Sequence, residues 1–169
     1  LHDALPIWVF QGSSALTLDG KGRINVPTRH RDALVEQAQG CLTITRHPDG
    51  CLLVYPRREW ENKREQIAAF PMQARALQRL LLGNAQDVEI DGSGRVLIAP
   101  ELRVAAGLSR DVMLLGMGAH FELWDAAALA RREADDLAQG PRLALRRRGR
   151  LSCHHWCGRE DSNFHGLPH

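Results

Sequence analysis

The sequence predicts a mainly β protein with helices, of the α+β class, built from two copies of one supersecondary unit. The turn Asp-Gly-x-Gly-Arg occurs in LDGKGRINVP (18–27) and again in IDGSGRVLIAP (90–100), at a constant offset of 72 residues. Apolar residues beside each turn alternate with polar ones, as in half-buried strands. Each copy fits the element order strand, turn, strand, short helix, strand and helix. Since one such unit is too small to bury its apolar face alone, we expect a pseudo-two-fold arrangement.

The first copy begins with two short strands, one on each side of its turn. Alternating apolar residues place these strands at 15–18 and 23–27. Pro27 ends the second strand because proline cannot donate a hydrogen bond to a ladder. Thr28 is then expected to cap a helix that runs to about residue 38.

A β-hairpin is expected next, with strands at 43–46 and 51–55 around the sequence HPDG. Pro48 suits the first central position of a type I turn, Asp49 the second and Gly50 the exit. This turn chemistry predicts two antiparallel strands in direct succession.

Helices and the second copy complete the pattern. Two helices separated by Pro71 are predicted at 57–69 and 72–82, and the second carries an apolar stripe of leucines. The last helix of the chain should begin at Asp125 as its cap. The predicted elements of the second copy are strands at 87–91, 95–100, 112–115 and 120–124, and helices at about 101–106 and from 125 to about 139.

The repeated turn also has a chemical use. Its aspartate can accept backbone N–H groups across the turn and pair with the arginine four residues later. An arginine fixed in this way loses little entropy on binding, and its guanidinium can grip a phosphate or a guanine edge with two hydrogen bonds. The candidate site residues are Asp19 and Arg23 in the first turn and Asp91 and Arg95 in the second. A plain hairpin with a surface ion pair is the alternative.

The net charge of +2 hides an asymmetry between the two copies. Residues 9–79 carry 11 basic and 7 acidic side chains, whereas residues 80–140 carry 5 and 10. The basic copy is therefore the better candidate for contact with a polyanion. It places Lys21, Arg29 and Arg31 close to its turn.

Four segments resemble the MraZ family, bacterial transcription regulators associated with the division and cell wall gene cluster. They are FQGSSALTLDGKGRINVPTRHRDAL, HPDGCLLVYPRREWE, LLGNAQDVEIDGSGRVLIAPELRVAAGL and GMGAHFELWD, and the similarity runs from about Val9 to Gln139. The resemblance implies two swapped-hairpin barrels related to the AbrB class, assembled into ring-shaped homo-oligomers. It also implies binding to double-stranded DNA at short direct repeats in the promoter of the chain's own operon, largely as a repressor.

The DxxxR signature of that family falls on Asp19 and Arg23, and again on Asp91 and Arg95. Lys21 occupies the variable middle of the first signature, where the second has a serine. Because the first copy is the basic one, we expect Arg23 and Lys21 to contribute more to DNA binding than Arg95. A cytoplasmic, nucleoid-associated location is expected.

Both ends of the chain lack the repeat pattern. Residues 1–8 are expected to be a non-native or disordered extension, and residues 141–169 an irregular basic tail that resembles a frame-shifted or read-through translation. The first repeat is accordingly placed at 9–79 and the second at 80–140. No apolar run approaches the roughly 18 residues that cross a bilayer, so no membrane association is expected.

An enzyme or a metal protein is not favoured by the sequence. The turn with Gly-Lys-Gly lacks the GxxxxGK[ST] spacing of a phosphate loop, and His30, His47 and His120 have no apparent nucleophile partner. The cluster CHHWC at 153–157 lacks the second group of ligands that a zinc site usually has. We predict no catalytic residue, no metal site and no cofactor.

A protein-interaction module of the same barrel class, antitoxin-like or structural, remains the alternative to a DNA-binding regulator. In that case Leu80, Leu81 and Leu82 would belong to a subunit interface instead of the core.

Overall fold

The computed structural model describes residues 9–139. The expected extension at 1–8, the tail at 141–169 and the CHHWC cluster within it lie outside the described residues. The chain divides into two compact units, residues 1–130 and 131–169, and of the second only the end of the last helix is described. Within the described part, no helix combines the length and the apolar character needed to span a bilayer.

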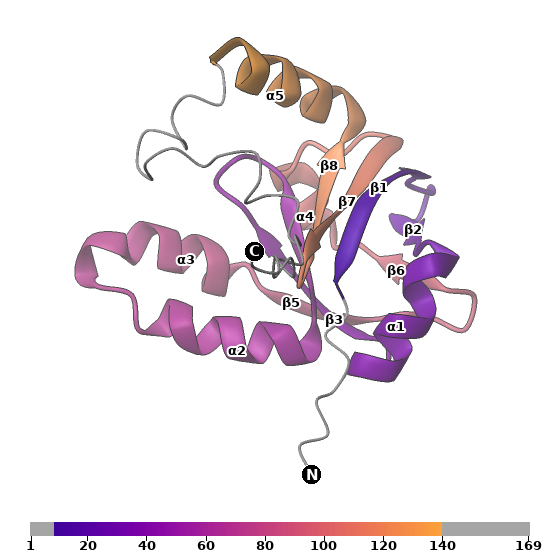
Figure 1. The fold of residues 1–169 in the computed structure, drawn as a ribbon, viewed down its shortest axis with the longest axis horizontal. Coiled ribbons are helices and arrows are strands. Elements are labelled where there is room, and N and C mark those ends of the chain that lie inside the picture. The colour runs from indigo at the N-terminus through magenta and orange to yellow at the C-terminus, as the bar shows by residue number, and fades with distance from the viewer. Residues whose placement is uncertain (1–8, 140–169) are drawn as a thin grey trace, which may run out of the picture. The chain divides into compact units, whose positions relative to one another are not determined.

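The described residues form eight strands, five α helices and one short 3-10 helix (Figure 1). The sequence-predicted α+β class is confirmed, and all strand pairings are antiparallel. In chain order the elements are β1 Phe10–Thr17, β2 Arg23–Asn25, α1 Thr28–Ala38, β3 Cys41–Arg46, β4 Leu52–Pro56, α2 Arg57–Ala68, η1 Met72–Ala74, α3 Arg75–Gly83, β5 Gln86–Glu89, β6 Arg95–Leu97, α4 Pro100–Ala105, β7 Asp111–Gly118, β8 Phe121–Asp125 and α5 Ala126–Gln139.

The two copies of the repeat are interlocked by their strand pairing. One sheet has the order β1-β7-β8-β4-β3-β5, so β1 of the first copy pairs with β7 of the second and β5 of the second pairs with β3 of the first. A separate two-stranded sheet joins β2 to β6. The exchange explains how two small units bury their apolar faces, because each supplies the pairing partner and the core contact that the other lacks.

The first turn therefore does not lie at the end of a simple β1–β2 hairpin ladder. β2 instead pairs with β6, with Arg23 opposite Leu97, Ile24 opposite Val96 and Asn25 opposite the arginine of the second turn. We call this two-stranded sheet the ribbon. Ile24 and Val96, the central pair of the ribbon, are only 4% and 2% exposed, so its inner face belongs to the core.

The main hydrophobic core contains residues of both copies. The aromatic rings of Phe10 and Phe121 contact each other within it, with centroids 4.3 Å apart, and His30 packs beside them. Its buried members are Phe10, Ile24, Val26, Ala33, Leu34, Leu42, Ile44, Leu52, Val54, Val96, Ile98, Leu102, Ala106, Val112, Leu114, Phe121 and Leu123.

A second core cluster lies where α2 and α3 pack together beside β4 (Figure 1). Its members include Trp60 and Leu81, and Leu77 and Leu82 are partly buried against it. The leucine stripe of the predicted helix therefore packs within the chain's own core through Leu77 and Leu81. Leu81 is buried in this cluster and Leu82 is partly buried against it, whereas Leu80 is not one of its members.

The predicted hairpin around HPDG is confirmed as β3 and β4, with Arg46 paired to Leu52 at its end. The expected cap at Asp125 is also confirmed, since its Oδ2 accepts the backbone N–H of Ala128 at 3.2 Å. The expected cap at Thr28 is wrong. Thr28 is already the first residue of α1, and the preceding residue, Pro27, has no side-chain group with which to cap it.

Candidate nucleic-acid interface

The first Asp-Gly-x-Gly-Arg turn, residues 19–23, is closed by its own hydrogen bonds. Asp19 Oδ1 accepts the backbone N–H groups of Lys21 and Arg23, each at 2.9 Å. Asp19 Oδ2 accepts Nε of Arg23 at 2.9 Å, which also forms the ion pair expected from the sequence. Backbone bonds from Asp19 N to Arg23 O and from Gly22 N to Asp19 O complete the loop. One carboxylate thus fixes both the backbone of the turn and the direction of its arginine.

The second turn, residues 91–95, repeats this arrangement. Asp91 Oδ1 accepts the backbone N–H groups of Ser93 at 2.8 Å and Arg95 at 2.9 Å, and Oδ2 accepts Nε of Arg95 at 3.2 Å. Asp91 N donates to Arg95 O, and Gly94 N donates to Asp91 O, as in the first turn. The equivalent bonds show that the repeated sequence produces one loop conformation twice, and we call the two turns the DGxGR loops.

Both loop arginines keep their outer nitrogen atoms available. The ion pair uses Nε in each case, and within residues 9–139 no hydrogen bond engages Nη1 or Nη2 of Arg23 or Arg95. The side chains are 25% and 32% exposed. Each guanidinium therefore presents a pair of donors to solvent, in the geometry that grips a phosphate or the O6 and N7 atoms of guanine.

Hydrogen bonds lower the pKa of both loop carboxyl groups. The backbone N–H of Arg23 is the main cause for the lowered pKa of Asp19, and the backbone N–H of Arg95 for that of Asp91. The carboxylates remain ionised at neutral pH, so each stays a charged acceptor for its arginine under those conditions.

The two DGxGR loops are tied to each other across the repeat. Val26 N donates to Gly94 O at 2.9 Å, and Ile98 N donates to Gly22 O at 2.8 Å. These two bonds extend the pairing of the ribbon by one step at each end. The loops consequently form one rigid unit whose spacing is set by the ribbon.

Two further arginines brace the loops crosswise. Arg31 in α1 lies against Gly94 of the second loop, and its Nε donates to Val26 O at 3.1 Å. Arg103 in α4 lies against Gly22 of the first loop, where an added Cβ would be 2.6 Å from Cζ of the guanidinium. Both glycines are buried and have positive φ, +81° at Gly22 and +76° at Gly94. Glycine is thus required here both by the backbone conformation and by the arginine packed on it.

The other two sequence-predicted residues differ in their surroundings. Lys21 is exposed at the first loop, and only its backbone takes part in the turn. Arg29 reaches from α1 to β1, where Nη2 donates to Ser14 Oγ at 2.7 Å and to Ser13 O at 3.2 Å. Its Nε donates to Nε2 of His30 at 3.1 Å. Arg29 is held beside the strand that enters the first loop, while Lys21 extends from the loop itself.

Sequence reasoning missed the role of Arg103. The offset of 72 residues places Arg103 at the repeat position of Arg31, and Gly94 at that of Gly22. The repeat of this arginine and this glycine in both copies was a signal that the sequence already contained. What the sequence did not reveal was that each arginine packs on the glycine of the opposite copy.

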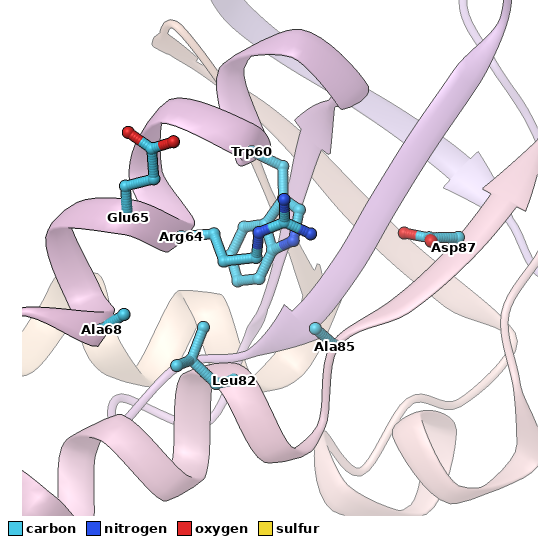
Figure 2. Close-up of a pocket in the computed structure, with 7 residues that line it drawn as sticks. All are labelled: Trp60, Arg64, Glu65, Ala68, Leu82, Ala85 and Asp87. Atoms are coloured by element: carbon cyan, nitrogen blue, oxygen red, sulfur yellow. The ribbon is translucent and has the colours of Figure 1, made fainter.

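A pocket elsewhere in the molecule offers no rival site of recognisable chemistry. It has a volume of about 490 Å³ and is lined by residues of α2, α3, β5 and the segment before β5 (Figure 2). Asp87 is engaged by Thr43 Oγ1 at 2.7 Å and by Arg57, and Figure 2 shows Glu65 far from it on the α2 side. The lining residues, Trp60, Arg64, Glu65, Ala68, Leu82, Ala85 and Asp87, include no hydroxyl, thiol or imidazole nucleophile.

The comparison with protein families matches both copies of the repeat to the same family. The family described as "MraZ protein, putative antitoxin-like" matches residues 9–82 and again 81–139. The chain belongs to the MraZ family. Both DGxGR loops fall within the matched MraZ segments, one in each.

Curated relatives agree with the MraZ assignment. A protein of Bordetella pertussis is 84% identical over 132 residues, which cover 78% of this chain and 93% of the relative. A protein of Herminiimonas arsenicoxydans is 63% identical, again over 78% of this chain and 93% of the relative. A protein of Cupriavidus pinatubonensis is 62% identical over 82% of this chain and 97% of the relative. Each of the three is named "Transcriptional regulator MraZ".

Proposed function

We propose that the chain is a transcription regulator that binds double-stranded DNA through its two DGxGR loops. Its targets would be direct repeats in the promoter of its own division and cell wall operon, which it would repress. The observation that carries the proposal is the pair of loops with equivalent hydrogen bonds, each with a partly exposed arginine that is held by an aspartate through Nε and keeps Nη1 and Nη2 unbonded within residues 9–139. The names of the curated relatives support regulation of transcription as the role.

The residues proposed to act in DNA binding lie in or beside the two DGxGR loops. Arg23, Arg95 and Lys21 would contact DNA directly, while Asp19 and Asp91 would orient the two loop arginines. Arg29 would contact the backbone beside the first loop, and Arg31 would act by bracing the second loop.

A ring-shaped homo-oligomer would supply the affinity that one pair of loops lacks. The loop region has little net charge because each arginine is paired with an aspartate, so one protomer would neutralise few phosphates. Several protomers in a ring would engage successive repeats on one DNA, and each later contact would be intramolecular. Exposed apolar side chains such as Met72 and Val104, at 74% and 82% exposure, support contact between copies. Such a regulator would act in the cytoplasm at the nucleoid.

The test is a gel shift on the upstream DNA of the chain's own gene, at two salt concentrations. Arg23→Ala and Arg95→Ala are made separately, with Arg58→Ala as the matched control because Arg58 is an exposed helical arginine outside the loops. Both loop variants should lose affinity and show a shallower salt dependence, whereas the control should bind like the unaltered chain. Full affinity in both loop variants would remove the loops from the mechanism.

The charge asymmetry predicts unequal losses. Arg23→Ala and Lys21→Ala should weaken binding more than Arg95→Ala, because the first loop has the additional cation of Lys21 where the second has a serine. Equal losses in Arg23→Ala and Arg95→Ala would show that the two loops contribute alike.

A protein-interaction module is the second candidate function, favoured by the antitoxin-like description of the family and by the exposed Val104 and Met117. Light scattering coupled to size-exclusion chromatography measures the assembly directly. A dimer that ignores the upstream DNA would favour this candidate over the ring-shaped regulator.

A further inference from the structure

The outer face of the ribbon carries four side chains in a compact array. Successive side chains of a strand point to opposite faces, so the burial of the central pair directs their neighbours outward. These neighbours are Arg23 and Asn25 on β2, and Arg95 and Leu97 on β6. Asn25 lies opposite Arg95, and Leu97 lies opposite Arg23, in the antiparallel register.

The array has the dimensions of a few base pairs. Residues opposite each other on paired strands have Cβ atoms about 4.5–5.5 Å apart, and two residues along a strand span about 7 Å. The two arginines occupy one diagonal of this array, while Asn25 and Leu97 occupy the other. A surface that brings the arginines to DNA therefore brings Asn25 and Leu97 to the same groove.

Asn25 and Leu97 are both available for such contact. Leu97 is 51% exposed although it lies beside the buried centre of the ribbon, and Asn25 is exposed as well. No hydrogen bond within residues 9–139 uses the side-chain amide of Asn25. Neither residue contributes to the core, so the fold itself does not require an amide at one position and an isobutyl group at the other.

We propose that Asn25 and Leu97 read base edges in the major groove, an inference that rests on the proposed function. The major groove admits a two-stranded β-ribbon, and asparagine can bind N6 and N7 of adenine with two hydrogen bonds. An apolar side chain contacts the methyl group of thymine. The neighbouring cations Arg23, Arg95 and Lys21 would hold the face against the anionic backbone.

The difference between the two residues gives the face a direction. Asn25 and Leu97 occupy the same repeat position, 72 residues apart, so the pseudo-two-fold relation of the copies superimposes an amide on an aliphatic group. A symmetric ribbon would read the same bases in both orientations, as symmetric proteins read palindromes. This ribbon instead distinguishes the two orientations of a short element. A directional element is what a direct repeat contains.

The experiment measures base preference with the full chain. Duplexes of the upstream DNA carry every single-base change across one repeat, and binding is compared for the unaltered chain, Asn25→Ala, Leu97→Ala and the exchange N25L/L97N. Asn25→Ala should reduce discrimination at one base position by roughly 5- to 150-fold, the range for a bidentate contact. Leu97→Ala should relax preference at a different position by a smaller factor. The exchanged variant should transpose the two preferences. Arg58→Ala is the control that should preserve the whole profile.

Two results would overturn the inference. Unchanged base preferences in both alanine variants would show that the two residues do not read sequence. A change in the molar mass of Leu97→Ala by light scattering, with the base profile intact, would assign Leu97 to a subunit contact. Failure of the unaltered chain to bind the upstream DNA would instead defeat the proposed function itself, so the two failures are distinguishable.

Discussion

The guanidinium of Arg31 lies on Gly94, in the space that a Cβ of any other residue would occupy. Arg103 lies on Gly22 in the same way, and both relationships join one copy of the repeat to the loop of the other. The arginines therefore fix the DGxGR loops through contacts between copies, while the aspartates fix them through contacts within each loop. Each loop is held from two independent directions.

Gly94→Ala is expected to disturb the second loop and its brace together. Alanine at a φ of +76° costs about 1–2 kcal/mol of conformational energy, and its Cβ would also displace Arg31. Gly92→Ala is the matched control in the same loop, because Gly92 has open space around its Cα and no positive φ. Denaturant unfolding should show a lower free energy of unfolding for Gly94→Ala alone, with weaker binding to upstream DNA. Equal stability of the two variants would contradict the brace.

Asp19→Asn should weaken DNA binding even though it makes the protein more positive. The amide cannot accept the same three hydrogen bonds from Lys21 N, Arg23 N and Arg23 Nε as a charged acceptor, so the arginine loses its fixed direction. Asp32→Asn adds the same charge on α1, away from the loop, and serves as the control. Fluorescence anisotropy with labelled upstream DNA measures both. Tighter binding by Asp19→Asn would mean that net charge outweighs orientation.

Thermal stability should fall as the pH is lowered from 7.5 to 5. Burial beside Phe10 and Phe121, with the nearby charge of Arg29, lowers the pKa of His30, and burial also lowers that of His120. A histidine with a lowered folded pKa stabilises the fold above its unfolded value of about 6.5, and this stability is lost as the pH falls toward the folded pKa. The melting temperature measured across this range by circular dichroism should therefore decrease on acidification.

His30→Gln should flatten that pH dependence. Glutamine cannot be protonated, yet its side-chain oxygen can still accept the Nε hydrogen bond of Arg29. The dependence that remains between pH 7.5 and 5 should belong to His120, because carboxyl groups with pKa values lowered from 3.8 lose their contribution only below this range. A His30→Gln variant as sensitive to pH between 7.5 and 5 as the unaltered chain would show that His30 does not contribute.

Phe121→Ala should be among the most destabilising single changes, at about 3–5 kcal/mol in the free energy of unfolding. Its side chain is 1% exposed and its ring contacts those of Phe10 and His30. Leu97→Ala provides the contrast, because a half-exposed leucine outside the core should change stability by less than about 0.5 kcal/mol. Urea unfolding followed by tryptophan fluorescence compares the two. A loss below 1 kcal/mol for Phe121→Ala would show that the core collapses around the cavity.

The sequence by itself determined the local chemistry of this protein. The conformation of each DGxGR loop depends on hydrogen bonds between residues at most four apart, so the motif predicted the hold of Asp19 on Arg23 and of Asp91 on Arg95. The hairpin at HPDG and the cap at Asp125 were predictable for the same reason. The N-terminus of α1 was not, because Pro27 begins that helix through its backbone without the side-chain cap expected from Thr28.

Only the tertiary structure decided which segments meet. The pairing of β2 with β6, 72 residues away, depends on burying the apolar faces of both copies at once, and the loop sequence contains no information on that partner. The exchange of strands then brought Arg31 to Gly94 and Arg103 to Gly22, and placed Asn25 and Leu97 on one exposed face. Hydrogen bonds within a turn are selected by neighbouring residues, whereas strand register is selected by the burial of a shared core.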